Sequence, residues 1–250
     1  MNKTESLKIN KEGWDKVAEE FFSACALPVY GPFAPSETEL NLFDEVKSKK
    51  ILEIGCGSGH SLQYLNEKGA SELWGLDLSS SQIDTANKLL KQNQVKANLF
   101  VSPMETNPGI PENYFDIVCS IFALGWTTDL SATLRNIFSY LKPKGTFIFS
   151  WEHPLYSKIK YDGDHYIIND SYNSEGENKK ESWRGVPIVM NQRKMSTFIN
   201  ELISTGFILE VIVEEFSGEV HNDCSPYDWY SSKRASLIPA TMIVKCYKPF

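Results

Sequence analysis

The sequence predicts an α/β protein in which helices cover both faces of a mostly parallel sheet. Apolar runs alternate with segments of helical periodicity along most of the 250 residues. The runs lack polar–apolar alternation, which is typical of strands buried on both faces of a parallel sheet. A glycine-rich turn follows the first run, and sheets of this kind bind ligands at the carboxyl ends of their strands. The predicted strands span residues 51–54, 73–77, 97–101, 115–121 and 145–151.

Helices are expected from residue spacing. Near the N-terminus, Trp14, Ala18, Phe21 and Phe22 recur at helical spacing and predict an amphipathic helix. A connector rich in proline and glycine follows over residues 27–35, and a second helix is expected between this connector and the first strand. A helical segment therefore precedes the sheet.

The helices between the strands have clearer end signals. One is expected to begin near Ser61 and end at Gly69, since glycine adopts the left-handed conformation that commonly ends helices. The next begins at Ser79, which is spaced from Gln82 as a capping box. A further helix before the fifth strand is expected to end near Pro143. Its buried stripe consists of Leu130, Leu134, Ile137, Phe138 and Leu141.

The turn after the first strand predicts a nucleoside-binding site. Residues 51–59 read ILEIGCGSG, and the glycines let the backbone approach a ligand closely. The helix that follows offers unpaired N–H groups to a polar or anionic ligand. Asp77 ends the second strand, where a carboxylate accepts hydrogen bonds from the hydroxyls of a ribose. The G-x-G-x-x-G fingerprint of dinucleotide sites requires glycine where His60 stands, so a dinucleotide is disfavoured.

The E-x-G-x-G-x-G string that begins at Glu53 resembles the first motif of class I S-adenosylmethionine-dependent methyltransferases. Later segments resemble that family in the same order: FDIVCSIFALGWTTDL at 115–130, LKPKGTFIFSWEHP at 141–154, and helix–glycine–strand at 193–216. The segment IPATMIVKCYKP at 238–249 resembles its last strand. The resemblance implies a Rossmann-like, seven-stranded, mostly parallel sheet with helices on both faces, which is the class I methyltransferase fold.

A single domain over residues 1–250 is expected, with four parts. These are an N-terminal helical lid (1–45), a cofactor-binding core (46–154), a cap insertion (155–190), and a last helix with antiparallel closing strands (191–250). The cap insertion is polar, aromatic and rich in turns, and it follows the fifth strand at the cleft end of the sheet. It is either a substrate-covering cap, since such loops often carry function, or a surface hairpin. A second long connection, over residues 217–239, carries His221, Trp229 and Tyr230, and its aromatics are either lid or core.

The resemblance implies that S-adenosylmethionine is the cofactor. Asp77 would hold the ribose hydroxyls, and the glycine turn would pass beneath the methionine moiety. Glu53 would order the turn and reach the amino group through water, or else be a buried acid satisfied by backbone N–H groups. Met104 would pack on the adenine face, with Glu105 or a backbone group at the adenine amine. The residues expected to bind the cofactor are Glu53, Gly55, Cys56, Gly57, Ser58, Gly59, Asp77, Leu78, Gln82, Pro103, Met104, Glu105, Ser120 and Ile121.

Methyl transfer from a sulfonium is an in-line displacement, so the protein mainly has to position the acceptor and exclude water. His153 is the candidate catalytic residue, because it follows the fifth strand, is expected to face the cleft, and titrates near neutral pH. Its alternative role is to hold the bend before Pro154. Tyr30, Trp126 and Arg193 are the candidate substrate residues. Trp126 is either a pocket wall or a core aromatic, and Arg193 either binds an anionic substrate group or pairs with an acid.

Composition limits the partners. A net charge of −7 and a pI near 5.2 argue against nucleic acid, which proteins bind through clustered Lys and Arg. No apolar run is long enough to cross a membrane, and the N-terminus lacks the apolar stretch of a secretion signal. Five cysteines without a C-x-x-C pair predict a reduced, cytoplasmic chain, and the four histidines show no metal-ligand spacing. We therefore expect a small soluble acceptor and no metal, with the acceptor atom (O, N or C) and the oligomeric state left open.

Two other functions are kept as alternatives. A nicotinamide-dependent oxidoreductase is disfavoured by His60 and by the lack of a Tyr/Lys or His/Asp pair for hydride chemistry. A non-catalytic S-adenosylmethionine-binding module stays open, because the SPMET stretch at 102–106 departs from the Gly-Asp-Ala that many family members carry after the third strand.

Overall fold

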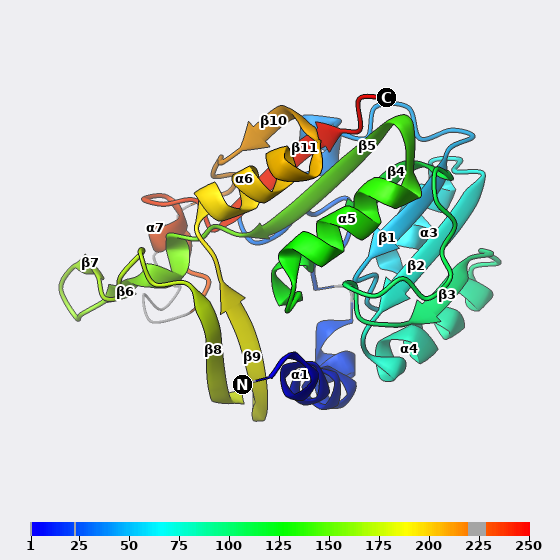
Figure 1. Cartoon of the computed structure of the whole chain (residues 1–250). Coiled ribbons are helices and arrows are strands. Elements are labelled where there is room, and N and C mark those ends of the chain that lie inside the picture. The colour runs from blue at the N-terminus through cyan, green and yellow to red at the C-terminus, as the bar shows by residue number, and fades with distance from the viewer. Residues whose placement is uncertain (1, 23, 220–228) are drawn as a thin grey trace.

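A sheet of seven strands runs through the structure in the order β10-β11-β5-β4-β1-β2-β3 (Figure 1). The computed structural model describes residues 2–22, 24–219 and 229–250. Neighbouring strands are parallel, except that β11 pairs antiparallel with β5 and β10. The predicted α/β fold with a seven-stranded, mostly parallel sheet is confirmed. The strands are β1 (Lys50–Ile54), β2 (Glu72–Asp77), β3 (Asn98–Val101), β4 (Phe115–Ser120), β5 (Leu141–Glu152), β10 (Ile208–Val213) and β11 (Thr241–Tyr247).

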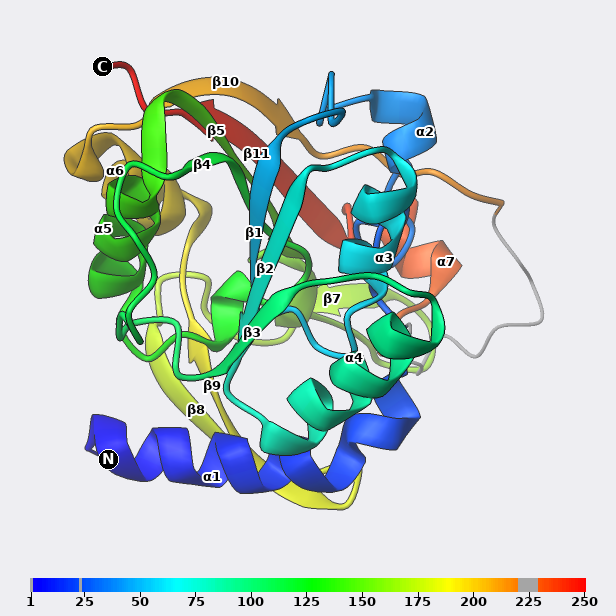
Figure 2. The same ribbon diagram turned by 90° about the vertical axis from the view of Figure 1, so that its right-hand side faces the viewer.

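Helices cover both faces of this sheet (Figure 2). Neighbouring residues of β1 point into different layers: Leu52 belongs to the apolar cluster of α5 and α6, and Ile51 to that of α3 and α4. Both side chains are fully buried, as expected for a central strand covered on both sides. In the described ranges, none of the helices is both long and apolar enough to cross a membrane. The helices are α1 (Lys3–Val17), α2 (Glu37–Leu40), α3 (His60–Glu67), α4 (Ser80–Gln92), α5 (Leu130–Tyr140), α6 (Met195–Thr205) and α7 (Ser232–Ala235).

The helical segment before β1 differs from the prediction. The helix α1 ends at Val17, and Ala18–Phe21 form the 3₁₀ turn η1, so Phe22 lies outside the helix and is exposed. The second expected helix is only the short α2. A capping box at Ser36 starts it, and Asn41 ends it in the left-handed conformation with φ +49°. Most of residues 24–49 is therefore irregular backbone that leads from the cavity to the sheet.

The predicted end of α5 near Pro143 was wrong. The helix ends at Tyr140, and Leu141 already pairs with Phe115 as the first residue of β5. The Leu141 side chain is fully buried. Leu141 was therefore correctly predicted to be buried, but it belongs to a strand and not to the helix. A short apolar run at an element boundary fits helix and strand patterns equally well.

Residues 155–192, where a cap or a surface hairpin was expected, contain two hairpins, and one of them packs against α1 (Figure 1). The amide of Asn10 exchanges two hydrogen bonds with the backbone of Val189, at 2.8 and 2.7 Å. Gly13 allows this close approach, because a Cβ atom there would lie 2.9 Å from the carbonyl oxygen of Pro187. The hairpin strands are β6 (Ile159–Tyr161), β7 (Tyr166–Ile168), β8 (Gly176–Trp183) and β9 (Val186–Gln192).

Candidate active site

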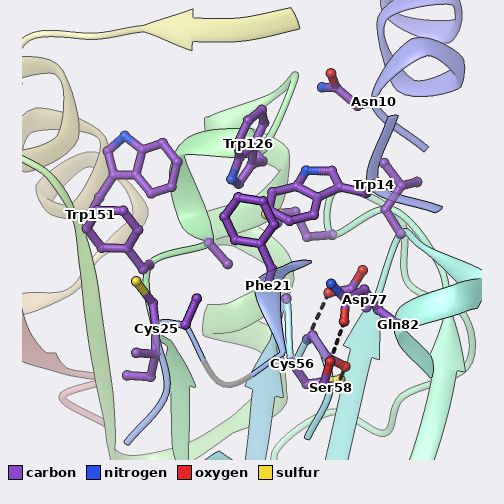
Figure 3. Close-up of a pocket in the computed structure, with 18 of the residues that line it drawn as sticks. Asn10, Trp14, Phe21, Cys25, Cys56, Ser58, Asp77, Gln82, Trp126 and Trp151 are labelled. Atoms are coloured by element: carbon purple, nitrogen blue, oxygen red, sulfur yellow. Dashed lines mark hydrogen bonds between the residues drawn. The ribbon is translucent and has the colours of Figure 1, made fainter. Parts of the chain in front are cut away.

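A cavity of about 480 Å³ lies at the carboxyl ends of β1, β2, β4 and β5 (Figure 3). Side chains from α1, η1 and the β8–β9 hairpin line its other side. Its volume falls in the range typical of small-molecule sites. Most residues expected to bind the cofactor line this cavity, namely Glu53, Gly55, Cys56, Gly57, Ser58, Asp77, Leu78, Gln82, Pro103, Met104, Glu105 and Ile121.

The glycine turn needs its glycines for different reasons. All three have positive φ, which L side chains rarely adopt: +73° at Gly55, +49° at Gly57 and +82° at Gly59. A Cβ at Gly55 would lie 2.4 Å from the Cβ of Ala123, and one at Gly59 would lie 3.1 Å from the Cβ of Ala86. The nearest atom to a Cβ at Gly57 would be 3.9 Å away. Gly55 and Gly59 therefore allow close packing, whereas the backbone at Gly57 borders the open cavity.

Asp77 holds the glycine turn and also faces the cavity. Its Oδ2 accepts a hydrogen bond from the N–H of Gly57 at 3.0 Å, and its Oδ1 accepts one from the N–H of Ser79 at 2.9 Å. Burial raises the pKa of Asp77, and these two backbone donors oppose that shift. A carboxylate oxygen has more than one lone pair, so each oxygen retains capacity for a ligand hydroxyl.

Glu53 is a buried acid with an unsatisfied oxygen. The residue is 2% exposed, and no described residue donates a hydrogen bond to Oε2. Burial raises the pKa of Glu53 to about 8, a hydrogen bond from Ser61 opposes the shift, and the charge of Asp77 adds to it. An unpaired buried polar group costs free energy. The site thus suits a ligand that brings a cation or a hydrogen-bond donor to this carboxyl.

The expected capping box at the start of α4 is only half formed. The N–H of Gln82 donates to the Ser79 hydroxyl at 3.1 Å, as predicted. The side-chain oxygen of Gln82 accepts instead from the hydroxyl of Ser58 at 2.7 Å (Figure 3). This bond ties the glycine turn to α4 and holds the Gln82 side chain at the cavity wall.

The SPMET stretch after β3 brings Pro103, Met104 and Glu105 to the cavity. The Oε1 atom of Glu105 accepts hydrogen bonds from the hydroxyl of Thr128 and from its backbone N–H, the latter at 3.1 Å. The carbonyl of Met104 accepts one from Asn136 at 3.3 Å. Glu105, one of the two groups expected at the adenine amine, is therefore held at the cavity wall by the loop after β4.

Aromatic rings form the wall opposite Asp77 (Figure 3). Trp126 is central: its ring centroid lies 5.2 Å from that of Trp14, 5.7 Å from that of Trp183 and 5.9 Å from that of Trp151. Phe21 stacks on Trp183 at 5.2 Å. Edge-to-face and offset-stacked pairs at such distances are favourable arrangements of aromatic side chains. Of the two readings of Trp126, the structure supports the pocket wall.

Residues 52–149, from β1 to β5, match the family described as "Methyltransferase domain". Over 190 residues the chain is 33% identical to an uncharacterized protein of Haemophilus influenzae, covering 71% of this chain and 74% of that one. The structure of the present chain resembles that of an S-adenosylmethionine-dependent methyltransferase of Mesorhizobium loti, with a TM-score of 0.67 and 26% identity. The match covers 84% of this chain and 95% of that one. The chain is a class I S-adenosylmethionine-dependent methyltransferase. This methyltransferase is also 33% identical to the malonyl-[acyl-carrier protein] O-methyltransferase of Priestia megaterium over a shorter match. That match covers 40% of this chain and only 35% of the other enzyme.

The side chain of His153 does not line the cavity, so the expectation that it faces the cleft was wrong. The Nε2 atom of His153 lies 2.8 Å from Oε1 of Glu214, and its Nδ1 accepts a hydrogen bond from the N–H of Leu155 at 3.2 Å. The histidine thus holds the bend around Pro154, which was its alternative role. The preceding residue, Glu152, lines the cavity instead.

Four more expected site residues do not line the cavity in the described part of the methyltransferase. Tyr30 is fully buried and donates to Glu37 at 2.6 Å, and Ser120 donates to the carbonyl of Ile54 at 2.9 Å. Arg193 donates to the carbonyl of Thr127 at 2.6 Å, and burial lowers its pKa to about 10. Each of these polar groups is used inside the protein. The fourth residue, Gly59, packs against α4 as described above.

Sequence reasoning missed most of the wall contributed by α1, β5 and β8. Trp14 and Phe21 were expected only as the apolar face of a helix, and Trp151 only as a strand residue. The six tryptophans are spread along the sequence, and only the fold brings five of them to the cavity, so the sequence held no signal that groups them. His221 lies outside the described residues. Trp229 and Tyr230, on the second long connection, line the cavity as the lid alternative for its aromatics expects. The lining residues that were not expected at the site are Trp14, Phe21, Trp151, Glu152, Lys180 and Trp183.

Proposed function

We propose that this methyltransferase transfers the methyl group to a small soluble acceptor, mainly by positioning it for in-line displacement. One observation carries the proposal: the glycine turn and Asp77 share a single cavity with an aromatic wall at the ends of β4 and β5. In the sheet, β4 and β5 follow β1 directly. An acceptor in the aromatic part therefore lies beside a cofactor bound at β1 and β2.

The residues of the cavity fit S-adenosylmethionine. The open backbone at Gly57 suits the methionine moiety, and the spare lone pairs of Asp77 suit the ribose hydroxyls. The unsatisfied Oε2 of Glu53 suits the amino group. Met104 is available to an adenine face, and Glu105 stands at the same wall. When bound, the cofactor supplies an electrophilic methyl group on a sulfonium.

The remaining task of the protein is to hold the acceptor and exclude water. Correct placement of two reactants contributes roughly 7–11 kcal/mol to lowering a barrier in favourable cases. Since His153 is engaged with Glu214, we propose no histidine base. An acceptor atom that carries a free lone pair and no proton to lose needs none.

We propose that α1 and the β8–β9 hairpin act together as a lid over the cavity. Asp15 on α1 accepts hydrogen bonds from the Ser79 hydroxyl at 2.6 Å and from the N–H of Ser81 at 3.1 Å, at the start of α4. Although burial opposes ionisation, hydrogen bonds from Lys11, Ser79 and Ser81 lower the pKa of Asp15 to about 2. This carboxylate therefore fastens the lid to the helix that carries Gln82.

Replacing Asp15 with alanine is expected to weaken cofactor binding roughly fivefold to thirtyfold, because a charged hydrogen bond contributes about 1–2 kcal/mol at a partly exposed helix N-terminus. Hydrogen exchange should accelerate in α1 and leave β1 and β4 unchanged. The low pKa of Asp15 means that its contribution is complete above pH 4 and is lost as the pH falls toward 2. Glu12→Ala, an exposed site on the same helix, is the control. Equal behaviour of the two variants would contradict the lid assignment.

Calorimetric titration with S-adenosylhomocysteine, with NADH as comparison, tests the proposed function together with an assay of S-adenosylhomocysteine release. We expect micromolar binding of S-adenosylhomocysteine, no binding of NADH, and turnover with a subset of small acceptors. Binding of NADH alone would favour the oxidoreductase. Binding of S-adenosylhomocysteine with no turnover on any class of small acceptor would favour a non-catalytic module.

A further inference from the structure

Indole rings line the acceptor side of the cavity, and four of them pack edge to face on one another. Five of the six tryptophans line the cavity, and they come from α1, the loop after β4, β5, β8 and the segment before α7. The ring centroids of Trp14, Trp151 and Trp183 lie 5.2 to 5.9 Å from that of Trp126, and those of Trp14 and Trp183 lie 5.4 Å apart. Flat apolar walls of this kind match a planar aromatic ligand better than a flexible aliphatic one, since stacked and edge-to-face pairs contribute beyond the buried area.

The ammonium group of Lys180 lies in the same wall of the cavity. Lys180 of β8 lines the cavity, and its Nζ lies 4.1 Å from the ring centroid of Trp229. Among residues 2–22, 24–219 and 229–250, no carboxylate lies within ion-pair distance of this ammonium. Burial lowers the pKa of Lys180, and the charge of Glu152 opposes the shift. A partly buried ammonium without an ion pair favours a ligand that carries negative charge.

Glu152 compensates this charge only in part. Its Oε2 accepts hydrogen bonds from Nε1 of Trp229 at 2.7 Å and from the hydroxyl of Tyr230 at 3.0 Å. Burial raises the pKa of Glu152, and these two donors oppose that shift more strongly than the charge of Lys180 does. Arg184, at the mouth of the cavity, does not add a free charge: its guanidinium lies 4.6 Å from the Phe21 ring centroid and pairs with Glu20 at 3.9 Å. An aromatic cage alone would also suit a cationic ligand, but the ammonium of Lys180 in its wall opposes one.

We propose that the acceptor is a planar aromatic compound with an anionic substituent, a carboxylate or phenolate, whose ring lies against Trp126 and Trp183 and whose charge lies beside Lys180. This inference rests on the proposed function, because it takes the acceptor to bind next to the cofactor. An acceptor oxygen that is already anionic has no proton to lose, which agrees with the placement of His153 outside the cavity.

The test compares matched probes in protein saturated with S-adenosylhomocysteine. The acids are 4-hydroxybenzoate and 6-hydroxy-2-naphthoate, the neutral controls are their primary amides, the cationic control is tyramine, and the aliphatic control is hexanoate. Calorimetry and ligand-observed NMR give the dissociation constants. We expect at least one aromatic acid to bind tenfold or more tightly than its amide, and hexanoate and tyramine to bind more weakly than that acid.

Lys180→Met removes the charge and keeps most of the side-chain length. The advantage of the acid over its amide is expected to fall to threefold or less, while the amide itself binds as in the parent protein. Lys179→Met is the matched control, since Lys179 is the exposed neighbour on β8 and pairs with Glu181 at 2.9 Å. It should leave the ratio unchanged.

The outcomes separate this inference from the proposed function. If S-adenosylhomocysteine binds but neither acid does, or the amides, tyramine or hexanoate bind as tightly, the inference is overturned and the proposed function stands. An unchanged acid-to-amide ratio in Lys180→Met also overturns it. Failure of S-adenosylhomocysteine to bind overturns the proposed function itself.

Discussion

Replacing Asp77 with alanine is expected to lower the affinity for S-adenosylhomocysteine at least a hundredfold. The ribose hydroxyls would each donate to an ionised carboxylate, and a hydrogen bond to a charged group contributes about 1.5–3 kcal/mol. Two such bonds correspond to a factor of roughly one hundred or more in the dissociation constant. Titration calorimetry of the purified variant measures this loss directly.

The control for Asp77 has to separate ligand binding from support of the turn, because Gly57 and Ser79 also donate to this carboxylate. We would compare 5′-methylthioadenosine with its 2′-deoxy analogue. The parent protein should lose about tenfold or more in affinity on removal of the hydroxyl, whereas Asp77→Ala should bind both compounds with similar weak affinity. Asp84→Ala, an exposed site on α4, should behave as the parent protein. Full sensitivity of Asp77→Ala to the 2′-hydroxyl would refute the assignment.

The cofactor half of the cavity was accessible to sequence reasoning because its geometry is local. The turn that contains Gly57 follows directly from β1, and Asp77 is the last residue of the neighbouring strand β2. Strand, turn and helix in that order bring these groups together in any parallel sheet. The layers were also predicted correctly, because apolar runs without polar–apolar alternation are typical of strands covered by helices on both faces.

The acceptor half was not accessible, because its residues are far apart in the sequence. Trp14, Trp126 and Lys180 meet only through the packing of α1 on the β8–β9 hairpin. At the end of β5, sequence reasoning selected His153, whereas Glu152 faces the cavity. His153 lies one residue beyond the end of β5, at the bend before Pro154, so the direction of its side chain is set by its contacts with Glu214 and Leu155 and not by the strand.

Replacing Glu53 with glutamine is expected to abolish a proton release that accompanies cofactor binding. Burial raises the pKa of Glu53 to about 8 in the free protein, so its carboxyl is mostly neutral at pH 7. An ammonium group placed at Oε2 would favour the ionised form and lower that pKa. Binding then releases up to one proton, and the affinity rises by at most tenfold per pH unit until the pH reaches about 8. Calorimetry in buffers of different ionisation enthalpy counts the protons.

The matched comparison removes the titration of the ligand itself. An α-amino group titrates near pH 7.7–8.0 in reference compounds, and this contribution is the same for the parent protein and for Glu53→Gln. The difference between their pH profiles therefore belongs to Glu53. The ligand 5′-methylthioadenosine has no amino group, and its binding should release no proton from either protein. Glu67→Gln, an exposed change on α3, should keep the parent profile.

Stability should change in the opposite direction to affinity. Because the folded protein keeps the Glu53 proton between pH 4.5 and about 8 while the unfolded chain does not, the free energy of unfolding falls as the pH rises through this range. One pKa unit corresponds to about 1.4 kcal/mol, so the whole effect is on the order of a few kcal/mol. Denaturant unfolding at pH 5 and pH 8 should show this loss in the ligand-free parent protein and a smaller one in Glu53→Gln. Equal pH dependence in the two proteins would mean that Glu53 is ionised and satisfied within the fold, as the alternative of a structural acid requires.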